Sequence, residues 1–151
     1  MKHATIVKRF EEHLRQEDLR LTPQRRRIFD RVYGTHEHFS AETLYGWLAA
    51  EGGPRVSRAT VYRTLDLLLR GGFVESLDVG QGELVYEHVL GHEHHDHMIC
   101  ESCGAIEEFH DDRIESFQLD AAKAKGFVVR SHVHRLMGLC RNCAGSQKAG
   151  S

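Results

Sequence analysis

Four cysteines occur as two C-x2-C pairs, and their spacing is the clearest chemical signal in the 151-residue sequence. Cys100 and Cys103 form the first pair, and Cys140 and Cys143 form the second after 36 intervening residues. Two such pairs can complete a tetrahedral zinc site. Disulfides are the alternative, but charged residues follow the N-terminus where a signal peptide would be apolar, so we expect a reducing, cytoplasmic setting. Because thiolates would fill all four positions, the spacing predicts a structural zinc rather than a catalytic one.

Histidine is the second signal, because six of the twelve histidines lie within 23 residues. These six are His88, His92, His94, His95, His97 and His110. On an extended segment, His94 and Asp96 would point to one face while His95 and His97 point to the other. This pattern predicts two sites with imidazole and carboxylate ligands, which suit Fe(II), Mn(II), Zn(II) or Ni(II). A solvated histidine-rich loop is the alternative.

Residues 92–97 also match the H-x-H-x-D-H string of metallo-β-lactamase-like hydrolases. A small metal-dependent hydrolase is therefore the alternative from another functional class. Those enzymes are larger, and their further ligands lie well downstream of the string. Here only 54 residues follow His97, and they contain the second cysteine pair. We interpret the string as accidental and expect neither enzymatic activity nor a small-molecule substrate.

The N-terminal half of the sequence predicts several helices. An apolar stripe at helical spacing covers residues 6–14, and further helices are expected after the N-cap residues Thr22, Ser40 and Ser57. The segment from 73 to 88 is predicted to form two strands joined by a glycine-containing turn. Helices followed by a two-stranded ribbon are typical of a winged helix-turn-helix domain.

The fourth predicted helix carries the candidate contacts to nucleic acid. If Val61 and Leu65 face the core, Arg63 points outward and Tyr62 lies on the flank. The small Ala59 allows a close approach to a groove, and Arg63 can reach a guanine edge or a phosphate. An ordinary surface arginine beside a half-buried tyrosine is the alternative, and amphipathicity does not decide between them.

The second half of the chain predicts a small α/β unit. Two short strands are expected between residues 98 and 106, and a helix after residue 111 is followed by a long strand over 127–139. The inward residues of that helix are expected to be Ile114, Phe117 and Ala121. On the long strand, His132 and His134 would share a face. A unit this small with so long a strand needs a partner to cover its sheet, so we expect a dimer.

Composition limits the classes of protein. The chain is 40% apolar and 28% charged, which is typical of a globular protein, and no apolar run approaches the length of a membrane span. The net charge of −2 excludes a uniformly basic coat for nucleic acid, but residues 1–86 carry 13 basic and 12 acidic side chains, whereas residues 87–151 carry 7 and 10. Five arginines between residues 20 and 31 suit either phosphate contacts or a solvated helix face.

We therefore predict an α+β protein with two domains. The expected division is a winged-helix domain at 1–88, a hinge at 89–91, a metal-binding dimerisation domain at 92–145 and a disordered tail at 146–151.

Taken together, these segments resemble the ferric uptake regulator (Fur) family of metal-dependent repressors. The matching motifs are LTPQR at 21–25, HFSAE at 38–42, SRATVYRTL at 57–65, HHDHMICxxCG at 94–104 and GxCxxC at 138–143. The resemblance implies a winged-helix domain joined to a dimerisation domain. It also implies binding to AT-rich double-stranded DNA operators as a metal-loaded homodimer, with a higher oligomer as the alternative, and hence a block on transcription.

The resemblance implies three further sets of functional residues. A regulatory metal site at the hinge would use His38, Glu87, His95, His97 and Glu108. A second metal site would use His94, Asp96, Glu115 and His132. Contacts to DNA would come from Arg20, Arg58, Thr60, Tyr62 and Arg63. Because the hinge ligands come from both domains, metal would shift the population toward the arrangement that binds DNA.

The branch of the family follows from two carboxylates. Zinc-sensing members often carry cysteine at the position of Glu87, and peroxide-sensing members need aspartate at the position of Glu108. Fe(II) is therefore the expected regulatory metal, with Mn(II) or Zn(II) as substitutes, and zinc-, manganese- and peroxide-sensing members are the alternatives. The stretch from Glu87 to His97 is one residue longer than in much of the family, so His88 or Glu93 could replace Glu87 as the hinge ligand.

Overall fold

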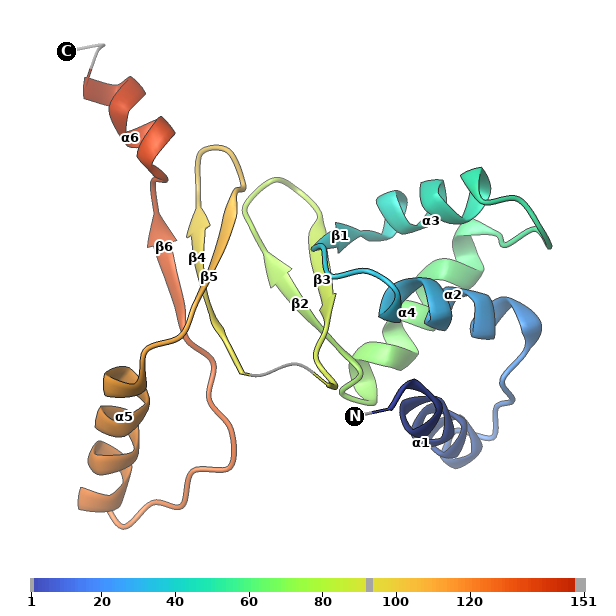
Figure 1. The fold of residues 1–151 in the computed structure, drawn as a ribbon, viewed down its shortest axis with the longest axis horizontal. Helices are drawn as coiled ribbons and strands as arrows, with labels where there is room; N and C mark the ends of the chain where they lie inside the picture. The colour runs from blue at the N-terminus through green and yellow to red at the C-terminus, as the bar shows by residue number, and fades with distance from the viewer. Residues whose placement is uncertain (1, 92–93, 149–151) are drawn as a thin grey trace. The chain divides into compact units, whose positions relative to one another are not determined.

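The computed structural model describes residues 2–91 and 94–148, and it divides the chain into two compact units (Figure 1). Of the described residues, 2–78 and 82–91 belong to the first unit, whereas 79–81 and 94–148 belong to the second. Each unit combines helices with one small sheet, which confirms the predicted α+β class.

Four helices build most of the first unit. They are α1 (His3–Gln16), α2 (Pro23–Tyr33), α3 (Ala41–Ala50) and α4 (Arg58–Arg70). The side chains of Thr22, Ser40 and Ser57 accept hydrogen bonds from the backbone N–H three residues onward, so all three predicted N-caps are observed. The cap positions set where α3 and α4 begin, and these two helices form the helix-turn-helix.

Apolar side chains of these helices meet in one core. Phe10 of α1 stacks on Phe29 of α2 with ring centroids 5.1 Å apart, and Phe73 packs edge-on against Phe10 at 5.2 Å. Val61 and Leu65 of α4 are fully buried, as the helical spacing predicts. This core holds the opposite face of α4 toward solvent.

A three-stranded antiparallel sheet completes the first unit. Its strands are β1 (Phe39–Ser40), β2 (Val74–Asp78) and β3 (Leu84–His88), in the order β1-β3-β2. The β2–β3 hairpin is the predicted wing, and its turn uses Gly80 and Gly82 at positive φ of 74° and 87°. The two-residue strand β1, which the sequence did not indicate, pairs Phe39 with Tyr86 and so ties the segment before α3 to the wing.

The second unit has a mixed sheet and two helices. Its elements are β4 (Asp96–Cys100), β5 (Ile106–Phe109), α5 (Asp112–Ala124), β6 (Arg135–Gly138) and α6 (Arg141–Lys148). The strand order is β5-β4-β6, with β4 antiparallel to β5 and parallel to β6. Among its described residues after 93, only Ile99 and Cys100 are buried hydrophobic residues. This unit therefore has almost no core of its own within one chain.

Several expectations for this unit differ from the structure. The long strand over 127–139 is replaced by the four residues of β6, because β4 offers pairing partners only from His97 to Cys100. On α5, Ile114 is half-buried, but Phe117 is 72% exposed and Ala121 is exposed as well, because no layer of the described chain covers that side of the helix. Residues 146–148 of the expected disordered tail belong to α6, and residues 149–151 of that tail lie outside the described residues. No helix in the described ranges is long and apolar enough to cross a membrane.

Candidate metal centres and nucleic-acid interface

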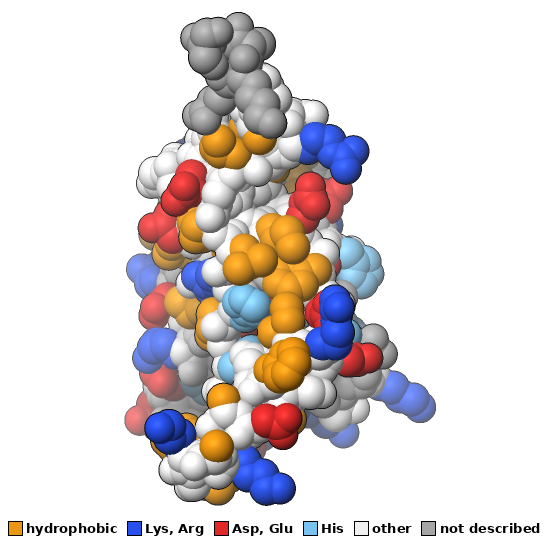
Figure 2. Space-filling model, turned by 90° about the vertical axis from the view of Figure 1, so that its left-hand side faces the viewer, with side chains coloured by type: hydrophobic (Ala, Val, Ile, Leu, Met, Phe, Trp, Pro, Cys, Tyr) orange, Lys and Arg blue, Asp and Glu red, His pale blue; other side chains and the backbone are white. Residues whose placement is uncertain are grey.

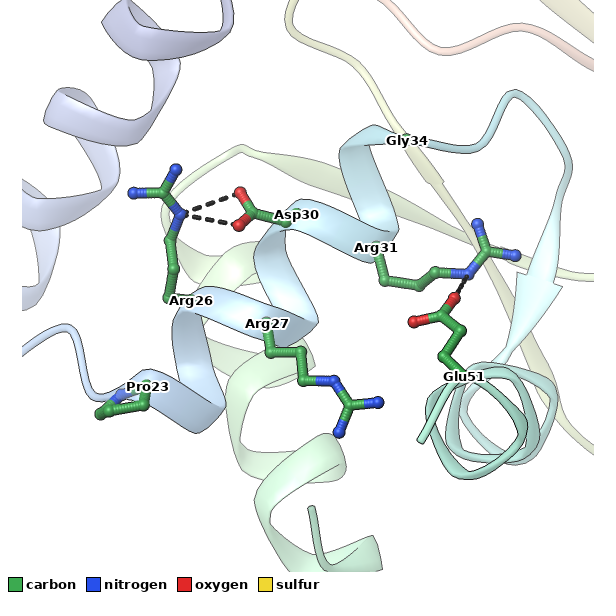
Figure 3. Close-up of a pocket in the computed structure, with 7 residues that line it drawn as sticks. All are labelled: Pro23, Arg26, Arg27, Asp30, Arg31, Gly34 and Glu51. Carbon is green, nitrogen blue, oxygen red and sulfur yellow. Dashed lines mark hydrogen bonds and ion pairs between the residues drawn. The ribbon is translucent and has the colours of Figure 1, made fainter. Parts of the chain in front are cut away.

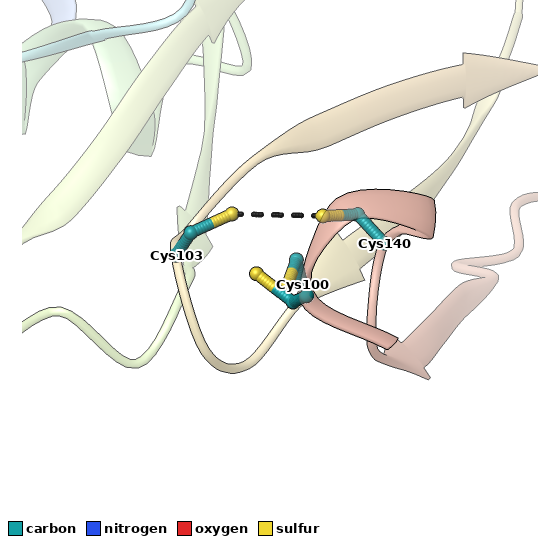
Figure 4. A group of neighbouring side chains, drawn as sticks. Cys100, Cys103 and Cys140 are labelled. Atoms are coloured by element: carbon teal, nitrogen blue, oxygen red, sulfur yellow. Dashed lines mark hydrogen bonds between the residues drawn. The ribbon is translucent and has the colours of Figure 1, made fainter. Parts of the chain in front are cut away.

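The four cysteines converge in the second unit. Cys100 ends β4, Cys103 lies in the turn before β5, and Cys140 and Cys143 lie at the start of α6. The four Sγ atoms all lie within 4.8 Å of one another, and all four thiols are free rather than disulfide-bonded. Cys103 Sγ and Cys140 Sγ are 3.8 Å apart (Figure 4). Sulfurs bonded to one zinc ion at ~2.3 Å lie about 3.8 Å apart in a tetrahedron, so the cluster fits structural zinc.

The pKa values of two cysteines in this cluster also favour a bound cation. Backbone N–H groups of Cys140 and Cys103 lower the pKa of Cys100 to about 6, which favours its thiolate. The pKa of Cys143 rises to about 12 although a hydrogen bond from Ser102 lowers it, because the neighbouring sulfurs of Cys140, Cys103 and Cys100 disfavour a further negative charge. Four thiolates this close are stable together only around a metal ion, which supplies the compensating charge.

A second cluster gathers imidazole and carboxylate groups of the same unit. His94 Nε2 lies 2.7 Å from His132 Nε2, 3.2 Å from Asp96 Oδ1 and 3.7 Å from Glu115 Oε1. His132 Nε2 lies 3.4 Å from the same Glu115 oxygen. Ligand atoms held ~2.1 Å from one ion lie about 3.4 Å apart in a tetrahedron, so these separations fit a single metal ion. The structure thus brings together all four residues expected for the second site.

The residues expected for the hinge site are divided between the units. In the first unit, His38 Nε2 lies 3.2 Å from Glu87 Oε2, which joins the segment before β1 to the end of the wing. In the second unit, His95 Nε2 lies 3.6 Å from Glu108 Oε1, and His97 is the register partner of Glu108 across β4 and β5. The first unit therefore carries two of the expected ligands, and the second unit carries the other three. The contact between His94 and Asp96, and the edge-on rings of His95 and His97, agree with the predicted alternation of faces.

His88, one alternative to Glu87, has a structural role in the first unit. Its Nε2–H donates a hydrogen bond of 2.7 Å to the backbone carbonyl of Thr35, and its ring packs on Tyr33 with centroids 4.7 Å apart. Glu87 instead lies 3.2 Å from His38, another expected ligand, and this contact favours Glu87 over His88 as the ligand. The other alternative, Glu93, lies outside the described residues, as does His92 of the hydrolase-like string.

The outward face of α4 carries the candidate contacts to DNA. Arg58 and Arg63 are exposed, and Tyr62 is 50% exposed, so these side chains can reach a groove. Thr60 is half-buried, and its hydroxyl lies 2.9 Å from the Ser57 hydroxyl, within the helix cap. Arg20, in the segment between α1 and α2, is also exposed.

A carboxylate on α3 holds two of these side chains. Glu42 Oε2 accepts a hydrogen bond of 3.1 Å from Arg58 Nε, and Glu42 Oε1 accepts one of 3.3 Å from the Tyr62 hydroxyl. The Arg58 guanidinium also lies over the Tyr45 ring, 4.3 Å from its centroid. Hydrogen bonding to Glu42 and its negative charge raise the pKa of Arg58. Glu42 therefore pre-positions two of the candidate DNA-reading residues.

The arginine run on α2 lines a shallow groove of about 560 Å³ on the first unit (Figure 3). Its arginines have intramolecular partners. Arg26 Nε pairs with Asp30 at 2.8 Å, and Arg31 Nε pairs with Glu51 at 2.8 Å. Arg27 donates to backbone carbonyls in and after α3, including Leu48 at 2.6 Å. For these three arginines, the structure favours a structural role over phosphate contacts.

Two neighbours of the candidate sites were missed from the sequence. Glu42 lies in a matched motif but received no role, because its distance from Tyr62 along the chain hides their contact. His134 Nδ1 lies 3.5 Å from Asp96 Oδ2, beside the second metal cluster. Its spacing of two residues from His132 was a signal that could have suggested this proximity.

A winged helix-turn-helix unit followed by a unit with a four-cysteine cluster and a histidine–carboxylate cluster defines a class, the metal-responsive DNA-binding regulators. Comparison with known proteins agrees. The pattern of the ferric uptake regulator family matches residues 16–137, so the chain belongs to that family. Members of this family are metal-responsive transcriptional regulators, and the chain is such a regulator rather than a hydrolase.

Individual relatives cover nearly the whole chain. The ferric uptake regulation protein of Campylobacter jejuni subsp. jejuni is 39% identical over 150 residues, which cover 99% of this chain and 94% of the relative. The solved structure of the Helicobacter pylori ferric uptake regulator Fur is 28% identical with a TM-score of 0.80, covering 95% of each chain. A zinc uptake regulator complexed with zinc and DNA is 29% identical with a TM-score of 0.55, covering 98% of this chain and 99% of the other.

Proposed function

We propose that this protein is an Fe(II)-responsive repressor that acts in the cytoplasm and binds AT-rich operators as a homodimer. The observation that carries the proposal is the pair formed by His38 and Glu87, 3.2 Å apart in the DNA-binding unit. His38 lies just before β1 and α3, and Glu87 lies near the end of the wing. A metal held by this pair would therefore act directly on two elements of the winged helix.

The same ion would draw its remaining ligands from the second unit. His95 just before β4 and His97 on β4 supply two imidazoles, and Glu108 on β5 supplies a carboxylate. With His38 and Glu87 they make a set of nitrogen and oxygen donors, which suits Fe(II) and also accepts Mn(II) or Zn(II). Binding that needs both units favours one relative orientation, so metal would raise the population that binds DNA. Zinc-, manganese- and peroxide-sensing regulators are the alternatives.

DNA reading would use α4. Arg63 and Tyr62 would contact bases in the major groove, Arg58 and Thr60 would lie against the backbone, and Arg20 would approach the minor groove. The exposure of Arg58, Tyr62 and Arg63 on one side of a helix whose other side is fully buried supports this assignment.

The second unit would form the dimer. Figure 2 shows hydrophobic side chains gathered in the middle of the face at the left-hand side of Figure 1. The most exposed large hydrophobic residues of this unit include Phe117, Leu119, Phe127, Val128, Val133 and Met137. So much exposed apolar surface in a unit with almost no core of its own suits an obligate partner, and a second copy supplies a matching face.

The experiment that tests the regulatory site compares two substitutions. His97→Ala is expected to weaken operator binding at limiting Fe(II) by about 5–150-fold, the range of typical allosteric coupling, while the cysteine-bound zinc stays in place. His110→Ala serves as the matched control, because this exposed histidine of the same unit pairs with Asp112 rather than with a metal cluster. Operator titrations that His97→Ala leaves unchanged would contradict the hinge site.

A further inference from the structure

Asp96 is the most enclosed side chain of the second metal cluster. It lies at the start of β4, and its carboxylate is only 1% exposed. Oδ1 faces the cluster, 3.2 Å from His94 Nε2 and 3.6 Å from His132 Nε2. Oδ2 faces the other way, 3.5 Å from His134 Nδ1. Among the described residues, neither oxygen accepts a hydrogen bond within normal geometry.

A buried carboxylate that accepts no hydrogen bond needs a partner for each of its two oxygens. A metal ion bound by His94, His132 and Glu115 would satisfy Oδ1, because their ligand atoms converge with it. It would leave Oδ2 buried without a partner, which costs free energy and leaves the carboxylate free to turn. His134 is the imidazole beside that second oxygen.

We propose that His134 is a positioning residue of the second metal site, which it serves by donating its Nδ1–H to Asp96 Oδ2 and so directing Oδ1 at the ion. The proposal rests on the cluster of His94, Asp96, Glu115 and His132 acting as a metal site in the proposed regulator. His134 lies outside the four side chains whose ligand atoms converge within 4.8 Å, so we place it outside the ligand set. Its part is that of an outer-sphere partner, which orients a ligand without touching the metal.

The surroundings of His134 hold its ring in place for this role. The backbone carbonyl of His134 accepts a 3.3 Å hydrogen bond from the N–H of His97, which lies next to Asp96 on β4. Its ring meets Phe109 edge-on at 5.7 Å, and Phe109 is the register partner of Asp96 across β4 and β5. His134 is therefore held by contacts with β4 and β5, the two strands that also position Asp96. Both side chains are thus oriented before a metal ion binds.

The test measures Co(II) binding to the full-length, zinc-containing protein in a His97→Ala background, which removes the hinge site. His134→Leu keeps a similar volume but no donor, and it is expected to weaken Co(II) binding at the second site by about 10–100-fold. His134→Gln, which retains an N–H donor, is expected to restore most of the affinity. The visible absorption of the Co(II)-saturated protein should be the same in the His97→Ala background and in its His134→Leu and His134→Gln derivatives, because the metal ligands do not change.

The possible results separate the proposal from its premise. Unchanged Co(II) affinity in His134→Leu, or no rescue by glutamine, overturns the positioning role. An altered spectrum at saturation also overturns it, because His134 would then be a ligand. His94→Ala should abolish this Co(II) equivalent altogether, and if it does not, the second site itself is wrong. Zinc content and circular dichroism confirm that each variant is folded, and His110→Leu in the same background controls for loss of an exposed histidine.

Discussion

Phe117 offers a quantitative test of the dimer face. It lies on α5, and 72% of its surface is exposed in the single chain. Burying a phenylalanine side chain completely contributes ~1.5–3 kcal/mol, so covering the exposed part contributes ~1–2 kcal/mol. In a two-fold symmetric dimer the residue counts twice, which gives ~2–4 kcal/mol. Phe117→Ser should therefore raise the dimer dissociation constant by about 30–1000-fold.

Sedimentation equilibrium over a range of protein concentrations measures this constant directly. Lys123→Ser is the matched control, because Lys123 is an exposed polar residue on the same helix. The two variants should have equal zinc content, so that a difference in dissociation reflects the interface. A Phe117→Ser protein that dimerises as tightly as the Lys123→Ser protein would refute the placement of the interface on this face.

Three further predictions concern the zinc and the DNA-reading surface. Cys100→Ser should release about one zinc ion per chain and disrupt the dimer, as measured by elemental analysis and sedimentation. A zinc-free protein that remains a stable dimer would show that the metal is not structural. Arg63→Ala should weaken operator binding by about 5–150-fold, the value of one bidentate base contact, and random DNA by much less; equal losses on both would identify a phosphate contact. Glu42→Gln should release Arg58 and Tyr62 and lower the operator-to-random affinity ratio by up to about fivefold, the scale of an exposed ion pair; an unchanged ratio at matched salt would contradict the positioning role of Glu42.

The first unit was predictable because its signals are local. Thr22, Ser40 and Ser57 cap their helices through hydrogen bonds to residues three positions away, and the buried stripe of α4 repeats with the helical period. β1 was missed because two residues carry no periodicity, and only pairing with β3 makes them a strand.

The second unit was harder to predict because much of what stabilises it lies outside one chain. Phe117 fits an inward position by its spacing, yet no described residue of the same chain covers it. The apolar residues after Gly126 suggested a long strand, but strand length depends on a neighbour, and β4 pairs with four residues only.

Residues of the candidate sites were also predictable only where the signal is local in the sequence. The cysteine cluster follows from two short spacings, because each C-x2-C turn brings its own sulfurs together. The approach of His134 to Asp96 depends instead on the register between β4 and β6, which no short motif encodes. Glu42 likewise meets Tyr62 only because α3 packs against α4.

We infer that a regulatory metal, rather than the cysteine-bound zinc, controls DNA binding by this protein. The most direct measurement is the operator affinity of protein that contains one zinc per chain, titrated anaerobically and separately with Fe(II), Mn(II) and Zn(II). We expect the zinc-only protein to bind weakly and Fe(II) to strengthen operator binding by about 5–150-fold, with Mn(II) and Zn(II) able to substitute in vitro. Operator binding that is equally tight before and after every metal addition would contradict metal-dependent control of DNA binding.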